Sequence, residues 1–158
     1  MIVKKVTDLI GNTPMLQLKM KNNNWNVYLK LEKFNPGGSM KDRMALNMIE
    51  QAEKSGKLKP GGTIIESSSG NTAIGLAIAS AIKGYKFIAV VDHHASKEKI
   101  DMIKAYGGET VVVGDDYGAN EVAVIERERT AKRMSEEIEN SFFPNQADNF
   151  DNRSAYIN

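Results

Sequence analysis

The stretch from Asn35 to Arg43 constrains the fold of this chain more than any other. It joins an apolar alternating run at residues 27–32 to a helical pattern, and it contains the pair Gly37 and Gly38 followed by Lys41. The order predicts a strand, a tight turn whose glycines adopt angles that a Cβ forbids, and a helix start. Because ligands of open α/β sheets bind at such edges, Lys41 lies at a candidate site. The expected inner face of the helix comprises Met44, Ala45, Met48, Ile49 and Ala52.

Lys41 has two interpretations at this stage. It could be a solvated lysine beside a turn, which is the common outcome for a short Gly-Gly-Ser-x-Lys pattern. It could instead be an amine that forms a Schiff base with a carbonyl cofactor, because lysine is nucleophilic when burial lowers its pKa. The nine residues alone do not decide between these interpretations.

A second stretch, Glu66 to Thr72, has the same organisation. It follows the short apolar run at residues 63–65 and opens an almost wholly apolar helix. Serine and threonine hydroxyls, an asparagine amide and unpaired backbone N–H groups at a helix N-terminus together predict a cradle for a carboxylate or phosphate. The alternative is a serine-rich N-cap without a ligand.

The rest of the chain alternates between strands and helices. We expect strands at residues 63–66, 86–91 and 109–113 and helices at 71–82 and 96–106, because apolar runs alternate with glycine-ended amphipathic segments. This order predicts an α/β fold, an open, mostly parallel sheet with helices on both faces. A charged helix is expected from about Asn120 to Glu139. Its expected inner stripe is Val122, Ile125, Met134 and Ile138, and residues 126–129 are interpreted as a solvated face.

Composition excludes several classes of function. The 158 residues suit one domain, or one domain and part of another. A net charge of +1, from 21 basic and 20 acidic residues, provides no field for nucleic acid or an anionic membrane. Cysteine is absent, which excludes thiolate chemistry and fits a cytoplasmic protein. His93 and His94 have no partners at ligand spacing, so we expect no metal site.

Together the two stretches resemble the cysteine synthase and cystathionine β-synthase family, pyridoxal-phosphate (PLP) enzymes of fold type II. The family's opening is matched at residues 9–15 and a further motif at residues 145–149, so that four motifs occur in family order. The resemblance implies an amino-terminal half, since the family's glycine-rich phosphate loop has no counterpart here. It also implies three parts: an arm at 1–34 that packs on a larger PLP domain, a small substrate-binding domain at 35–145, and the start of the larger domain at 146–158.

The resemblance further implies residue roles and an activity. Lys41 is the expected Schiff-base lysine, and Asn71 is expected to bind the cofactor's phenolic oxygen. The substrate carboxylate is expected to bind Ser68, Ser69, Asn71, Thr72 and Gln146. The implied reaction is β-replacement on O-acetylserine or O-phosphoserine through an aminoacrylate, in a homodimer when the chain is full length.

Two alternatives stay open, and a third lacks support. Residues 90–94 and 104–107 look closer to the siderophore-pathway branch, which joins O-phosphoserine to glutamate. Departures from the usual family pattern, such as Ser67, Ser68 and Ala73 near the second loop, weaken the case for an ordinary cysteine synthase. The chain could also be a non-catalytic half-domain. A nucleotide-binding α/β protein lacks support, because neither G-x-G-x-x-G nor a Walker-type loop is present.

Overall fold

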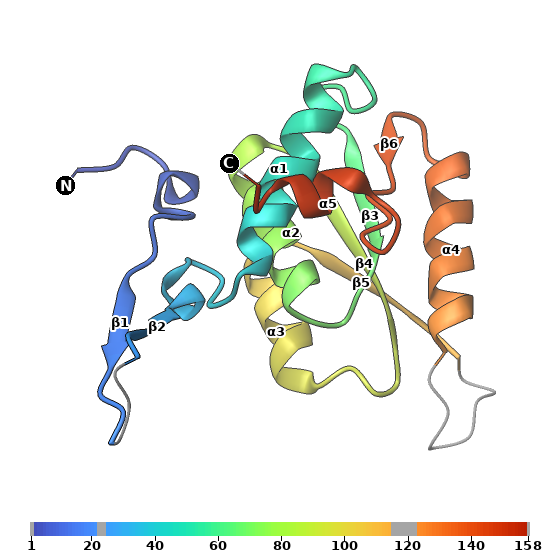
Figure 1. Ribbon diagram of the computed structural model, residues 1–158. Coiled ribbons are helices and arrows are strands. Elements are labelled where there is room, and N and C mark those ends of the chain that lie inside the picture. Colours follow the sequence, from blue (N-terminus) through green and yellow to red (C-terminus); the bar gives the residue numbers. More distant parts are fainter. Residues whose placement is uncertain (1, 22–24, 115–122, 158) are drawn as a thin grey trace.

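The computed structural model describes residues 2–21, 25–114 and 123–157, and its centre is a parallel sheet (Figure 1). The strands are β3 (Thr63–Ser67), β4 (Lys86–Asp92), β5 (Glu109–Val113) and β6 (Ser141–Phe142), in the order β5-β4-β3-β6. Each pairing in this sheet is parallel. The expected strands at 63–66, 86–91 and 109–113 are therefore confirmed.

Helices cover both faces of the sheet, as expected. On one face lie α1 (Lys41–Lys54), α2 (Asn71–Lys83) and α3 (Lys97–Ala105), and on the other lies α4 (Val124–Glu137) (Figure 1). Alternation along the strands divides the core accordingly. Ile64 and Phe87 belong to the cluster under α1–α3, whereas Ile65 and Val90 pack with Ala131 of α4. Since successive side chains of a strand point to opposite faces, a strand buried on both faces is continuously apolar.

The direction in which the chain crosses the sheet reverses between β3 and β6. From β3 the chain steps through α2 to β4 and through α3 to β5, and α4 then returns across the other face to β6. This is a topological switch point, and ligands of open α/β sheets bind outside the carboxyl ends of the strands at such a point. The topology therefore predicts a ligand site among the residues that follow Ser67 and Phe142.

The helix expected at residues 120–139 is shorter and has a different inner face. It begins at Val124, while residues 115–122 lie outside the described part of the chain, and with them Val122 of the expected stripe. Ile125 is 63 % exposed, whereas Met134 and Ile138 pack against the sheet as expected. Ile125 is nine residues before Met134, and at about 100° per residue the two lie roughly 180° apart around the helix. The inner face instead runs through Arg127 and Ala131.

Two further segments belong neither to the parallel sheet nor to the helices that cover it. An antiparallel hairpin of β1 (Met15–Leu18) and β2 (Val27–Lys30) follows a short 3₁₀ helix, η1 (Val6–Leu9), and precedes a second, η2 (Glu32–Phe34). The hairpin stands away from the helices and sheet (Figure 1). At the other end, α5 (Phe150–Ser154) lies against α1, where Asn47 Nδ2 donates to the Asp151 carbonyl at 2.7 Å.

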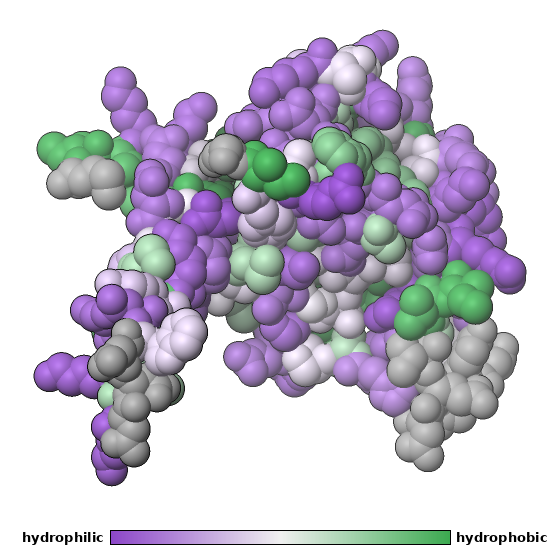
Figure 2. Space-filling view, in the orientation of Figure 1, coloured by the Kyte–Doolittle hydropathy of each residue, from purple (hydrophilic) through white to green (hydrophobic). Residues whose placement is uncertain are grey.

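The hairpin and its neighbours carry much of the exposed apolar surface. Most of the face in Figure 2 is hydrophilic, with small separate apolar patches. Trp25 is 76 % exposed and Met15 61 % exposed, although both residue types are usually covered in folded proteins. No helix among the described residues combines the length and apolar character needed to cross a membrane.

Helices α1 and α2 make a close contact at Gly75. A Cβ added at Gly75 would lie 3.1 Å from the Lys41 carbonyl oxygen, 3.1 Å from Ala45 Cβ and 3.2 Å from Asp42 Cα. Glycine at position 75 therefore permits the first turn of α1 to pack closely against the second turn of α2. As a result Lys41, the first residue of α1, is held beside the N-terminal turn of α2, which begins at Asn71.

Gly75→Ala should lower stability. Glycine to alanine inside a helix normally stabilises by about 1 kcal/mol. Here the added methyl group would lie closer to backbone atoms of α1 than most Cβ atoms do, and overpacking costs about 1–3 kcal/mol. Urea unfolding should show a net loss of up to about 2 kcal/mol. Lys132→Ala, at an exposed position of α4, is the control. A gain in stability for Gly75→Ala would contradict the close contact.

Candidate active site

The loop that presents Lys41 needs its two glycines for different reasons. Gly38 has φ of +77°, in the left-handed region, and its N–H donates to the Asn35 carbonyl at 2.8 Å to close the turn. Gly37 does not have a positive φ, contrary to expectation. Its constraint is space, because a Cβ there would overlap the carboxylate of Asp42, which accepts a hydrogen bond from the Gly37 N–H. Asp42 is thus a buried support for the loop as well as a negative charge in the first turn of α1.

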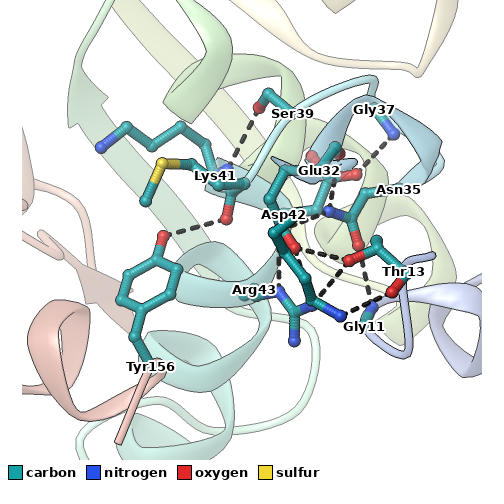
Figure 3. Close-up of polar contacts among 12 residues, drawn as sticks. Gly11, Thr13, Glu32, Asn35, Gly37, Ser39, Lys41, Asp42, Arg43 and Tyr156 are labelled. Carbon is teal, nitrogen blue, oxygen red and sulfur yellow. Dashed lines mark hydrogen bonds and ion pairs between the residues drawn. The ribbon is translucent and has the colours of Figure 1, made fainter. Parts of the chain in front are cut away.

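The other side of this loop is tied to the N-terminal arm by a polar network around Glu32 (Figure 3). Arg43 donates to both carboxylate oxygens of Glu32, at 2.8 Å from Nε and 2.9 Å from Nη2. Thr13 Oγ1 donates to the same carboxylate at 2.6 Å, and Asn35 Nδ2 donates at 2.9 Å. Asn35 also accepts the Gly11 N–H. The hydrogen bonds from Arg43 are the main cause that lowers the pKa of Glu32 to about 2.

The amine of Lys41 is not committed to this network. Its side chain extends away from Asp42 and Arg43 (Figure 3), and among the described residues its Nζ has no hydrogen-bond or ion-pair partner. Lys41 lines a pocket of about 420 Å³ together with Met40, Tyr156 and residues 147–150, 152 and 153. Tyr156 Oη donates to the Met40 carbonyl at 2.9 Å and so holds the end of the chain against this loop. A free amine beside a pocket can react.

The second loop starts α2 without a side-chain cap. The N-cap residue is Gly70, and no side chain caps it, so the expected alternative of a serine N-cap is wrong. Ser68 is buried and its Oγ accepts the Gly70 N–H at 3.3 Å. Ser69 Oγ accepts from Arg127 Nη1 at 3.3 Å. The backbone N–H groups of residues 71–73 find no acceptor in the described part of the chain, which leaves them available to an anion.

Gln146 is held in place by four hydrogen bonds. Its N–H donates to Glu66 Oε2 at 3.1 Å, and its carbonyl accepts from Asn152 Nδ2 at 2.7 Å. Its side-chain Oε1 accepts from Thr72 Oγ1 at 2.6 Å, and its Nε2 donates to the Ser67 carbonyl at 3.4 Å. The structure therefore joins Thr72 and Gln146 across 74 residues of sequence, at the carboxyl ends of β3 and β6.

Asn71 is placed at the same helix start but is exposed. Its Oδ1 accepts from Lys99 Nζ of α3 at 2.6 Å. The sequence analysis did not single out Lys99, because a lysine on an exposed helix face carries no distinguishing pattern. His93 and His94 are exposed in the turn after β4, and no cluster of His, Cys, Asp or Glu within the described ranges could hold a metal ion.

Arg127 lies at the candidate site, although its position in the charged run 126–129 predicts a solvated face. Its side chain is only 12 % exposed, and its Nη1 lies 3.2 Å from Oδ2 of the buried Asp92 as well as 3.3 Å from Ser69 Oγ. This ion pair ties α4 to the end of β4 and to the second loop. The correct helical phase, through Ala131 and Met134, would have put Arg127 on the inner face.

Glu66 is a deeply buried acid of this edge, at 1 % exposure, and burial raises its pKa to about 7. Its carboxylate accepts from the backbone N–H of Ser67 at 2.9 Å as well as from that of Gln146. Burial also raises the pKa of Asp42. Glu66, Ser67, Arg127 and Gln146 line a pocket of about 400 Å³ at the switch point.

Comparison with known proteins identifies the family. The family described as "Pyridoxal-phosphate dependent enzyme" matches residues 6–158. The chain belongs to this family. It is 49 % identical over 156 residues to a putative cysteine synthase of Sinorhizobium fredii, covering 99 % of this chain and 46 % of that protein. It is 46 % identical over 158 residues to a probable cysteine synthase of Bacillus subtilis, covering 98 % and 49 %.

Solved structures of the PLP family share the fold. A hydrogen sulfide-producing enzyme from Fusobacterium nucleatum matches with a TM-score of 0.86 and 39 % identity, covering 98 % of this chain and 49 % of that one. An O-acetylserine-dependent cystathionine β-synthase from Helicobacter pylori matches with 0.86 and 34 %, covering 99 % and 51 %. The fold is PLP fold type II, as expected, and the cofactor of this family is pyridoxal 5′-phosphate. The chain spans about half the length of these relatives.

The residues present fit this cofactor. The unpaired Lys41 amine suits its aldehyde group, and the first turn of α2 offers a side-chain amide and unpaired backbone donors to anionic oxygens. The contact at Gly75 keeps these groups on neighbouring helix starts.

Glu32→Gln should remove part of the acid sensitivity of the fold. A pKa lowered from 4.5 to about 2 means that ionised Glu32 contributes stability above about pH 4.5, which is lost as pH falls towards 2. The variant should lose about 1–3 kcal/mol at neutral pH, since hydrogen bonds to a charged group are removed. Its stability should then change less than that of the wild type across this acid range.

Urea unfolding at several pH values checks this expectation, with Glu136→Gln as a control, because Glu136 is an exposed carboxylate on α4. If Glu32→Gln and the wild type lose stability in parallel on acidification, the network around Glu32 is not the source of the effect.

Proposed function

We propose that the protein containing this chain is a PLP-dependent enzyme that replaces the β substituent of a serine-derived amino acid, as cysteine synthases do. One observation carries the proposal: Thr72 and Gln146 meet at the switch point, beside a helix start that holds the free amine of Lys41. This arrangement offers a covalent anchor for the cofactor and a separate polar site for an amino acid. The cysteine synthases among the relatives support the same reaction class.

Lys41 has two tasks in this proposal. Its Nζ would hold the cofactor covalently through the aldehyde carbon, and the amine, once free of that link, would take the proton from the α carbon of the substrate. When bound, pyridoxal 5′-phosphate supplies an electron sink that makes this proton acidic. Asp42 and the Glu32 network keep the loop around Lys41 rigid, so that the amine returns to the same position in each turnover.

The amino-acid carboxylate binds at the second loop. The unpaired N–H groups of residues 71–73 and the helix dipole of α2 favour a negative charge there. Because Thr72 donates to Oε1 of Gln146, the orientation of the amide is fixed. One N–H of its Nε2 donates to the Ser67 carbonyl, and the second N–H remains for the carboxylate. Ser68 and Ser69 add hydroxyl groups to this carboxylate site. Asn71 would bind the phenolic oxygen of the cofactor, to which its Nδ2 can donate a hydrogen bond.

The leaving group is acetate or phosphate. Turnover with O-acetylserine compared with turnover with O-phosphoserine distinguishes these two leaving groups. A synthase that joins O-phosphoserine to glutamate is the alternative reaction, and product analysis with sulfide and with glutamate distinguishes it. A non-catalytic half-domain is the third possibility, and it predicts no turnover with either substrate.

The whole protein is proposed to be a cytoplasmic homodimer. Residues 1–34 are proposed to pack on a larger PLP domain that begins near residue 146, while residues 35–145 form the smaller substrate-binding domain. Apolar side chains in and beside the hairpin, such as Trp25 and Met15, are exposed. This exposure supports the proposal that another part of the protein packs against the hairpin.

Lys41→Ala should abolish the visible absorption band of the bound cofactor in the full-length protein. The band depends on the covalent link to the lysine amine, which alanine cannot form. Lys104→Ala, at an exposed position of α3, is the matched control and should keep the band. A band of normal strength in Lys41→Ala would remove Lys41 from the proposed role.

The amino-acid carboxylate should account for much of the binding at the second loop. The carboxamide of the substrate should bind the full-length protein about tenfold or more weakly, because a neutral group matches the N–H donors and helix dipole less well than an anion. Hydrogen exchange of residues 67–73 should slow with the acid and change little with the amide. Equal protection by both compounds would place the carboxylate elsewhere.

A further inference from the structure

Glu66 connects the two segments that meet at the switch point. It lies near the carboxyl end of β3, and each of its two carboxylate oxygens accepts a different backbone N–H. One N–H belongs to Ser67, which begins the second loop, and the other belongs to Gln146, which follows β6. One buried side chain thus bridges segments that are 80 residues apart in sequence.

The position of Gln146 depends on this bridge. Asn145, the preceding residue, has φ of +48°, a left-handed conformation that asparagine tolerates better than most residues. The turn directs the Gln146 N–H to Glu66, while the side chain of Gln146 meets Thr72. Without an acceptor at Glu66, this buried edge would lose one of the contacts that hold the two segments together, beside the hydrogen bonds of the Gln146 side chain to Thr72 and to the Ser67 carbonyl.

A carboxyl group at this buried position is energetically unfavourable for folding. Burial of a charged group from water is unfavourable unless it is paired and hydrogen-bonded, and an apolar residue of similar size is often at least as stable. The charged groups of α4 that line the same pocket are Arg127 and Glu128. Arg127 is paired with Asp92, and Glu128 raises the pKa of Glu66 further, so neither offsets the cost.

We propose that Glu66 is a positioning residue for the amino-acid carboxylate, because it holds Gln146 at the spacing at which Gln146 meets Thr72. The inference rests on the proposed function for the identity of the ligand, but the bridge itself is a property of this chain. Glu66 acts through the backbone of Gln146 and does not touch the reacting atoms.

The wild-type full-length protein provides a test that needs no variant. The backbone amide protons of Ser67 and Gln146 should shift together in one titration step near pH 7, as the carboxyl group that accepts both hydrogen bonds changes its charge. Selectively labelled protein followed by NMR reports both signals. If the two amides shift in separate steps, or neither shifts at any pH at which the protein stays folded, they do not share one carboxyl group and the proposal is overturned.

Glu66→Gln in the full-length protein tests the consequence for substrate. Its amide oxygen can accept one of the two N–H groups, but its NH₂ group faces the other, so one bond is lost. We expect hydrogen exchange at residues 145–147 to accelerate about tenfold and KM for O-acetylserine to rise about tenfold, with kcat changed less than about twofold. The visible band from the cofactor on Lys41 should stay.

Two comparisons separate the possible outcomes. Thr72→Val should raise KM similarly but leave the amide exchange of Gln146 unchanged, and Glu136→Gln should change neither. If Glu66→Gln has the same hydrogen-exchange rates and the same KM as the wild type, Glu66 is not a positioning residue, while the proposed function stands. A wild-type protein without the visible band or turnover would instead contradict the proposed function, and the amide titration would still report on the bridge.

Discussion

The close contact between α1 and α2 at Gly75 sets the geometry on which the candidate site depends. A Cβ at Gly75 would lie 3.1 Å from the Lys41 carbonyl oxygen and 3.2 Å from Asp42 Cα, which is tighter than most Cβ contacts, so glycine favours this close approach. The two helices therefore start side by side, and each is preceded by a loop that follows a strand, β2 of the hairpin for α1 and β3 of the parallel sheet for α2. A covalent anchor and an anion-binding helix start are thereby placed within one site, although they come from separate β-to-α connections.

Buried carboxylates provide the second level of organisation. Asp42 accepts the Gly37 N–H, Glu66 accepts the Ser67 and Gln146 N–H groups, and Asp92 accepts the His94 N–H at 3.1 Å. Each acid therefore fixes the backbone of a loop beside the site. Burial of these groups is unfavourable in itself, so they lower the stability of the fold in exchange for defined loop positions. Loops held in this way can present donors to a ligand with little rearrangement.

Much of the fold could be predicted from local patterns. The continuous apolar run of β4, the amphipathic face of α1 and the glycines that end α2 and α3 are properties of single segments, and the corresponding elements are confirmed. The error at α4 arose where the apolar pattern is weak, because Ile125 and Val124 are apolar but exposed while Arg127 is inside. A short pattern with two possible phases does not determine which face a helix buries.

The sequence by itself determined the order of the elements, the loop that carries Lys41 and the motifs that indicate the PLP family, because these depend on neighbouring residues and on short spacings. The tertiary structure decided which distant residues meet. The hydrogen bond from Thr72 to Gln146, the Glu66 bridge and the Arg127 pair with Asp92 join segments separated by tens of residues. Their partners are set by strand order and by the return of α4 across the sheet, and no local pattern of residues contains that information.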